Sequence, residues 1–277
     1  MIADAPREFV NRPNRFRSPG AFRDALRELA NSRDAVWQLI WRDVASRYRQ
    51  SFLGLGWAIL TPLALVLVFV YLRGVDVVNG GPTNVPYPLF LYTGLLSWQL
   101  MQGAVSRMTG CLVANPTLVT RVRFPREIVV LASMGGAIFD FVLGTIVLAG
   151  FFVWYGVTPE WTMLFAPLLL AVQMAFALSL GLVLSVLNGA LRDIANMVPL
   201  GMTLWMFLTP VLYPRGAPWM DWLNPMSPFL VAFRDLAFTG QLTMVGPLIA
   251  AVVVTAVALP LSWRLFHVML PRVAETI

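Results

Sequence analysis

The sequence predicts an all-α integral membrane protein with six transmembrane helices, an N-terminal amphipathic interface helix and re-entrant outer helices before the sixth span. Composition is the first indication, because 58% of the 277 residues are hydrophobic and only 12% are charged. Several apolar runs are also long enough to cross a bilayer core of about 30 Å at about 1.5 Å per helical residue. We therefore divide the chain into a mobile cytoplasmic tail (1–20), amphipathic interface helices (21–51) and a six-helix transmembrane domain (52–277).

The region before the first apolar run has two parts. The tail is rich in arginine and proline and has no apolar period. In the segment DAVWQLIWRDVASRYRQ, by contrast, large apolar side chains recur at helical spacing along one face, namely Trp37, Ile40, Trp41, Val44 and Tyr48. A helix with tryptophan on one face and arginine on the others is expected to lie in the membrane interface.

Six apolar runs follow and predict the spans. They cover residues 53–72, 89–105, 128–154, 163–187, 196–213 and 244–266. In the fourth run, small residues lie four apart on one stripe and predict close helix packing, either within a subunit or across a dimer; they are Ala177, Gly181, Ser185 and Gly189. Before the sixth run, a segment with Ser227 as the expected helix cap is too short to span, and we expect it to be re-entrant or interfacial on the outer side.

Arginine placement predicts the orientation. If the N-terminus is cytoplasmic, that side receives the ten arginines before the first span, followed by Arg107, Arg121, Arg123, Arg126, Arg192, Arg264 and Arg272. The other side receives only Arg73, Arg215 and Arg234. Because cytoplasmic loops carry the excess of positive residues, this asymmetry places both termini in the cytoplasm of a multi-pass protein.

Several function classes are excluded by residues that the chain lacks. All twenty basic residues are arginine, so there is no Walker A lysine and no ATP site of that kind. The single cysteine, Cys111, and the single histidine, His267, argue against a disulfide framework or a Cys/His metal cluster. A pI near 10.2 would suit nucleic acid, but in a polytopic protein it indicates topology, and we expect no nucleic-acid partner.

Four motifs, in order along the chain, resemble a known family. They are RDVASRYRQSFLGLGWAILTP (42–62), NPTLVTRVRFPREIVVLAS (115–133), RDIANMVPLGMTLWMFLTPVLYP (192–214) and LNPMSPFLVAFRDLAFTG (223–240). They are similar to the membrane (permease) subunit of bacterial ABC-type polysaccharide exporters of the O-antigen and teichoic-acid type. The resemblance covers nearly all of the chain after about residue 20.

The resemblance implies an assembly and a cargo. The permease would pair with a second copy of itself in the bacterial cytoplasmic (inner) membrane and with two nucleotide-binding ATPase subunits on the cytoplasmic face. Those subunits would bind ATP and Mg, so that this chain carries no cofactor and is not itself an enzyme. The exported substrate would be a lipid-linked polysaccharide, such as O-antigen or a similar cell-surface glycan.

The second motif is the strongest candidate for contact with the ATPase. Asn115 and Pro116 favour a turn, the next residues can make one or two helical turns, and Pro125 ends them. Arginines can pair with carboxylates of a partner, and Phe124 can fill a pocket. The candidate coupling residues are Asn115, Pro116, Arg121, Arg123, Phe124, Pro125, Arg126, Glu127, Arg192 and Asp193. A simpler alternative is that these arginines only fix topology and that Arg192 and Asp193 pair locally.

Two further groups of residues are candidates for substrate contact. Arg42, Asp43, Arg47 and Tyr48 precede the first span, where a lipid-linked substrate would enter, although they could simply face lipid headgroups. Channel candidates within the spans are Tyr92, Trp98, Gln99 and Asp140. An intramembrane carboxylate such as Asp140 is costly, so it should face a wet channel, pair with an arginine or stay protonated.

The outer segment supplies the last candidates, Asn224, Pro225 and Arg234, which would shape an outer gate or merely the re-entrant fold. Two other functions remain open. One is an ABC permease of the same architecture that exports a drug or another small molecule. The other is a membrane glycan or lipid transferase, which the scattered acids and solitary histidine disfavour because such enzymes place acidic or histidine pairs at the membrane boundary.

Overall fold

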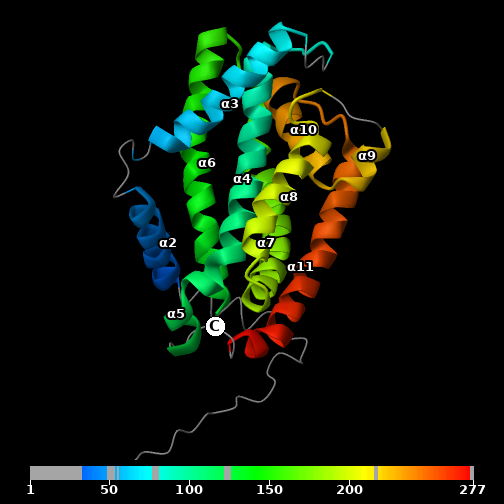
Figure 1. Cartoon of the computed structure of the whole chain (residues 1–277). Coiled ribbons are helices and arrows are strands. Elements are labelled where there is room, and N and C mark those ends of the chain that lie inside the picture. The colour runs from blue at the N-terminus through cyan, green and yellow to red at the C-terminus, as the bar shows by residue number, and fades with distance from the viewer. Residues whose placement is uncertain are drawn as a thin grey trace, which may run out of the picture.

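A computed structural model describes residues 33–48, 54, 56–76, 81–121, 126–214 and 218–274. Within these ranges every regular element is helical (Figure 1). The predicted mobile tail and the first part of the predicted interface region lie outside the described residues. The elements are α2 (Arg33–Tyr48), α3 (Gly56–Gly74), α4 (Tyr87–Ala114), α5 (Pro116–Arg121), α6 (Glu127–Tyr155), η2 (Trp161–Phe165), α7 (Ala166–Ala190), α8 (Ile194–Leu208), α9 (Pro218–Leu223), α10 (Met226–Phe238) and α11 (Val245–Ala274).

The all-α membrane class is confirmed, but six spans are not. By length and composition, 4 helices can cross a membrane: α3, α6, the continuous stretch Trp161–Ala190, and α11. The fifth predicted run forms α8, which has 15 residues and is too short for a bilayer core on its own. The second forms α4, which has 28 residues but is more polar than the four. It also extends well beyond the predicted end at residue 105.

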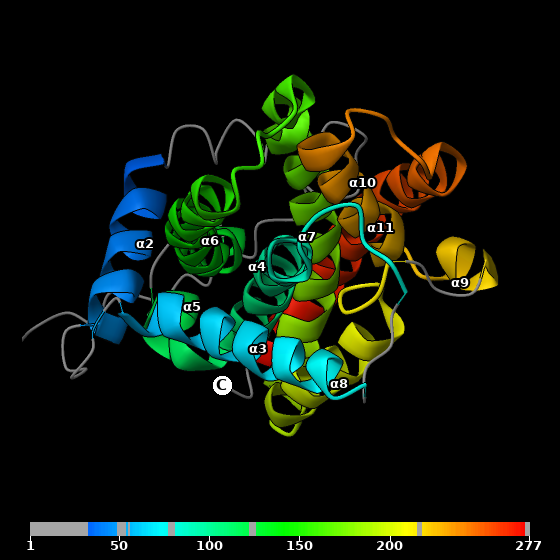
Figure 2. The same ribbon diagram turned by 90° about the horizontal axis from the view of Figure 1, so that it is seen from above.

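The polarity of α4 has a structural explanation, because this helix is the centre of the bundle. It packs against α3, α6, α7, α8 and α10, and most of its side chains are buried (Figure 2). A helix surrounded by protein can carry polar groups if they find partners inside. Ser97, for example, donates its hydroxyl to Gln173 Oε1 of α7 at 3.1 Å, and the Gln173 amide donates to the Ser97 carbonyl at 2.8 Å.

The small-residue stripe of α7 packs within the subunit. A Cβ added to Gly181 would lie 2.6 Å from the Met108 side chain of α4, and Ala177 and Ser185 are fully buried. Of the two arrangements that the sequence left open, the structure therefore shows contact between α7 and α4. Close backbone approach of this kind supplies packing where lipid gives no hydrophobic drive.

The segment between α8 and α11 folds onto the bundle as two short helices. Almost every residue of α10 is buried, although its re-entrant position in a membrane is not confirmed. The predicted cap is wrong: Ser227 lies inside the first turn of α10, and the N-cap position is Pro225, which makes no side-chain cap bond. Directly before it, Asn224 Oδ1 accepts the Met226 amide at 3.0 Å.

The two ends of the bundle differ. The short helix α5 and the C-terminal end of α11 lie at one end, and α9 and α10 lie at the other (Figure 1). The predicted orientation makes the α5 end cytoplasmic. Helix α2 lies beside α6 in both views (Figures 1 and 2), and Figure 1 shows it toward the α5 end.

Candidate functional site

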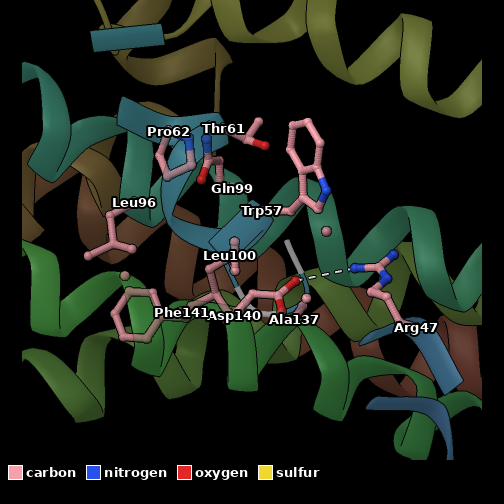
Figure 3. A pocket seen from close by; sticks show the side chains of 14 residues that line it. Arg47, Trp57, Thr61, Pro62, Leu96, Gln99, Leu100, Ala137, Asp140 and Phe141 are labelled. Carbon is pink, nitrogen blue, oxygen red and sulfur yellow. Dashed lines mark hydrogen bonds and ion pairs between the residues drawn. The ribbon is translucent and has the colours of Figure 1, made fainter. Parts of the chain in front are cut away.

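A cavity of about 400 Å³ lies between α2, α3, α4 and α6. Each of these helices supplies part of its wall (Figure 3). The wall is made by Arg47 of α2, by Trp57, Ala58, Thr61 and Pro62 of α3 with Gly54 before it, by Leu96, Gln99, Leu100 and Gly103 of α4, and by Ala137, Asp140, Phe141 and Gly144 of α6.

A carboxylate between two arginines forms the charged part of the wall. Asp140 Oδ2 pairs closely with Arg107 of α4 and lies 3.4 Å from Arg47 Nη1 of α2. The structure thus shows the arginine pairing that was one of three states open to Asp140. The Arg47 side chain is 50% exposed and that of Arg107 only 19%, so Arg47 is the partner that other molecules can reach.

Glycine on α6 makes this arrangement possible. A Cβ added to Gly136 would lie 2.8 Å from Arg107 Nη1, so a larger residue would displace the guanidinium on its way to Asp140. About two helical turns farther along, at about 3.6 residues per turn, a Cβ at Gly144 would lie 2.4 Å from the Leu96 side chain. The sequence of α6 therefore brings α4 close enough for an arginine of one helix to reach a carboxylate of the other.

The cavity is amphipathic. In Figure 3 Arg47 lies at one side of the cavity and Leu96 and Phe141 lie at the other, with Asp140 between them. Trp57 and Gln99 also line the cavity wall (Figure 3), and Trp57 is 54% exposed. Such a cavity can hold a molecule that carries an anionic group, an apolar part and hydrogen-bonding groups together.

Two predicted channel residues lie elsewhere. Tyr92 and Trp98 are fully buried in the subunit core and do not line the cavity. The Tyr92 hydroxyl donates to the Gly144 carbonyl at 2.9 Å. The Trp98 indole donates to Gln102 Oε1 at 3.1 Å and packs edge-on against Trp205 of α8. Each ring joins α4 to a neighbouring helix.

Helix α2 is fixed to the bundle by packing along α6. A Cβ added to Gly135 would lie 2.5 Å from the Ile40 side chain, so Ile40 fills the space that this glycine leaves. Trp41 packs edge-on against Phe139, and Val44 is 6% exposed. The side chain of Tyr48, at the end of α2, lies outside the described residues.

A hydrogen bond also connects α2 to the turn between α4 and α5. Arg42 Nη2 donates to Asn115 Oδ1 at 2.6 Å and to Asp43 Oδ1 at 2.9 Å. The Asn115 amide group donates to the Cys111 carbonyl at 2.9 Å, which turns its oxygen toward Arg42. Pro116 then begins α5.

Much of the predicted coupling segment lies outside the described residues, including Arg123, Phe124 and Pro125. Arg121 ends α5, and its side chain is likewise outside the description. Arg126 is half-buried directly before α6. Glu127, the first residue of α6, points into the protein: its carboxylate Oε1 lies 2.5 Å from His267 Nε2 of α11. Arg192 and Asp193 are exposed in the turn between α7 and α8, at the α5 end.

Two predicted residues at the opposite end hold the segment between α8 and α11 against the bundle. Asn224 accepts from the Trp205 indole at 2.9 Å and donates to Thr209 Oγ1 at 2.9 Å, beside Pro225. Arg234, only 4% exposed, donates to the Pro210 and Val211 carbonyls at 2.6 Å each and lies over the Phe90 ring at 3.6 Å. Both residues therefore join α10 and its approach to the end of α8.

Comparison with known proteins identifies the family that has this sequence. The family model described as ABC-2 type transporter matches residues 34–238, which include every helix that lines the cavity. The chain belongs to the ABC-2 type transporter family. One relative, the O-antigen export system permease protein RfbA of Myxococcus xanthus, is 30% identical over 259 residues, which are 91% of this chain and 98% of the relative. Two RfbA proteins of Klebsiella pneumoniae are 28% and 27% identical over 207 residues, which are 73% of this chain and 79% of each relative.

The partners of two polar residues of this ABC-2 protein, Arg107 and His267, were not predicted from the sequence. Arg107 was assigned to the cytoplasmic side because α4 was predicted to end before it, yet it pairs with Asp140 within the bundle. His267 was taken as solitary, yet it contacts Glu127, 140 positions earlier in the chain. The available signal was the rule that charges inside a membrane bundle pair with each other. Using it requires the register between helices, which the sequence does not provide.

Proposed function

We propose that this protein is the permease subunit of an ATP-driven exporter that moves a lipid-linked polysaccharide of the O-antigen type across the bacterial cytoplasmic membrane. Membership of the ABC-2 family and the O-antigen export role named for the relatives support the cargo class. The amphipathic cavity between α2 and the spans is the observation that carries the proposal. Its chemistry matches a molecule with an apolar chain, a phosphate link and sugar hydroxyls.

The charged end of the cavity suits the phosphate link. Arg47 lies 3.4 Å from Asp140, which is longer than a strong charge-assisted hydrogen bond. Phosphate oxygens can therefore draw Arg47 away, because arginine binds phosphate bidentately at shorter distance. Arg107 meanwhile stays paired with Asp140, so the carboxylate keeps a cationic neighbour while the substrate is bound.

The rest of the cavity suits the other two parts of the molecule. Leu96, Leu100 and Phe141 offer an apolar surface for the first units of a lipid chain. Trp57 presents an exposed ring on which a sugar can stack, and the Gln99 amide can bond hydroxyls. A hydrophobic drug would use only the apolar surface and would gain nothing from Arg47 or Gln99.

Coupling to ATP would begin at the predicted cytoplasmic end. Two ATPase subunits, which bind ATP and Mg, would press on the segment from Asn115 to Glu127. The bond from Arg42 to Asn115 would pass this movement to α2, and α2 carries Arg47. A second copy of the permease would complete the path, and the exposed apolar face of α8 supports such a contact; it includes Met197, Leu200, Leu204 and Phe207.

The test replaces Arg47 and measures export. Membrane vesicles that contain the permease and its ATPase should lose most export of lipid-linked glycan when Arg47→Gln is introduced, because the phosphate loses its bidentate partner. Arg264→Gln is the matched control, since Arg264 is exposed on α11 and does not line the cavity. Unchanged export in Arg47→Gln would contradict the substrate site. ATP hydrolysis that responds to a hydrophobic amine but not to lipid-linked glycan would instead support the small-molecule exporter.

A further inference from the structure

The buried contact between Glu127 and His267 joins residues that lie 140 positions apart in the chain. Glu127 is the first residue of α6, directly after the segment on which the ATPase would act. His267 lies near the end of α11. The two side chains are 5% and 11% exposed, and their nearest atoms, Oε1 and Nε2, are 2.5 Å apart. The proposed export function has so far made no use of this pair.

The other ring nitrogen fixes where one hydrogen lies. His267 Nδ1 is 2.9 Å from the Trp263 carbonyl oxygen, one turn earlier on α11. A carbonyl oxygen can only accept, so Nδ1 must carry a hydrogen and donate it. This bond also fixes the ring plane, together with the rings of Trp263 and Phe266, whose centroids lie 5.3 and 5.5 Å from that of His267. Nε2 is thereby aimed at Glu127.

The short contact then requires a second hydrogen. If Nε2 and Oε1 both lacked one, two lone pairs would face each other at 2.5 Å beside a buried negative charge. The hydrogen between them either belongs to an imidazolium that donates to a carboxylate or to a carboxylic acid that donates to a neutral imidazole. The pair has zero net charge in both cases, which is the form that a poorly solvated site favours.

We infer that Glu127 and His267 share one retained proton and act as positioning residues that hold the end of α11 against the start of α6. The functional consequence of this inference rests on the proposed function. If an ATPase presses on the segment from Asn115 to Glu127, that segment has one fixed end, at Glu127. Displacement would then appear mainly at the Asn115 end, where Arg42 connects to α2 and the cavity. Neither residue needs to touch ATP or glycan for this role.

The first test uses the fact that the chain has one histidine. Full-length permease, purified with a tag that lacks histidine and labelled with ¹⁵N-histidine, gives a single imidazole in NMR spectra. We expect a protonated Nδ1 and a strongly deshielded proton between Nε2 and Glu127, both unchanged from about pH 6 to about pH 8, where a free histidine changes charge. An unprotonated Nδ1, or ordinary titration over this range, would overturn the inference.

Two variants of Glu127 test whether the deshielded proton depends on the Glu127 carboxylate. In Glu127→Gln the amide can donate to Nε2 of a neutral ring, so the contact survives without the retained proton, and the deshielded signal should vanish while Nδ1 stays protonated. In Glu127→Ala the contact is lost and the ring should acquire mobility. Glu160→Gln, at an exposed glutamate near the opposite end, is the control and should leave the spectrum unchanged. A deshielded proton that persists in Glu127→Ala would also overturn the assignment.

The second test measures coupling in vesicles that contain the permease and its ATPase. Glu127→Ala should raise the ATP hydrolysed per glycan exported by roughly tenfold, a typical size for a coupling effect between sites. Glu127→Gln should restore the ratio toward that of the unaltered protein, because the hydrogen bond is kept. Equal ratios in all three proteins would overturn the positioning role. Absence of any glycan export would count against the proposed function alone, since the NMR result does not depend on cargo.

Discussion

The two ends of the segment from Asn115 to Glu127 are joined to other helices by contacts of opposite kind. At the first end Arg42, with a side chain 49% exposed, bonds Asn115 at 2.6 Å. At the second end Glu127 and His267 meet almost without solvent. An exposed polar contact contributes about 1 kcal/mol or less, whereas the loss of one partner from a buried pair costs about 3 kcal/mol or more. Asn115 can therefore separate from Arg42 at a low cost in free energy, whereas separating Glu127 from His267 costs more.

This difference predicts which end of the segment moves when it is pushed. A push on a body held at one end moves the other, so helix α2 and the cavity that it borders are expected to respond before α11 does. The cavity wall is consistent with this, because α2 contributes the most exposed of its charged side chains, Arg47. Three experiments test the contrast between the two ends.

The largest effect is expected at the buried end. His267→Leu keeps bulk but leaves the Glu127 carboxylate buried without its imidazole, which should lower the free energy of unfolding by about 3 kcal/mol. Thermal unfolding of the purified protein in detergent would show this as a lower Tm. Arg264→Leu, one turn away on the exposed face, serves as the comparison. An equal Tm in both variants would contradict the expected stabilisation by the buried pair of Glu127 and His267.

An intermediate effect is expected where α2 rests on α6. Gly135→Val adds a side chain in the space that Ile40 fills, and overpacking of this kind costs about 2 kcal/mol. Because α2 has few other contacts, the strain should release α2 rather than unfold the bundle. Protease cleavage on the N-terminal side of α3 should become faster while Tm changes little. Gly150→Val is the control, since a Cβ at Gly150 meets nothing within 4 Å. Equal cleavage of the two variants would contradict the docking of α2 through this glycine.

The smallest effect on stability is expected at the exposed end. A double-mutant cycle of Arg42→Ala and Asn115→Ala should give a coupling energy of about 0.5 kcal/mol. Export should nevertheless fall, because the same bond is the proposed connection between the segment and α2. A coupling energy as large as that of Glu127 and His267 would mean that both ends are fixed. Unchanged export in the double variant would show that the movement of α2, if it occurs, does not need this bond.

Sequence patterns predicted the helices better than their partners. Length and hydropathy were sufficient for α3, α6 and α11, because lipid-facing helices must be apolar along their whole length. They were less successful for α4 and α8. The hydropathy of α4 falls where Gln99, Gln102 and Arg107 enter the sequence, and only its enclosure by other helices explains how it tolerates them. The end of α8 depends on Thr209 and on the bonds of Asn224, which are tertiary.

The sequence predicted several residues of the candidate site but not that they lie together. Arg47, Gln99 and Asp140 were proposed separately, as residues near substrate uptake or within a channel, and the structure places all three on one cavity wall. Periodicity could not unite them, because they come from three helices whose register depends on glycines at α6. The same limitation hid Arg107 and His267. A polar residue in a span indicates that a partner exists, but its identity follows from packing.

The enclosure of α4 has a consequence for how the protein is made. A segment with this many polar groups gains little by leaving the translocon for lipid alone, because each unpaired polar group in hydrocarbon is costly. Its partners Asp140 and Gln173 belong to α6 and α7, which are synthesised later. We expect α4 to complete its insertion only when those helices arrive. A nascent chain cut before Glu127 should then leave α4 accessible to water-soluble thiol reagents at Cys111, a residue that the finished fold buries.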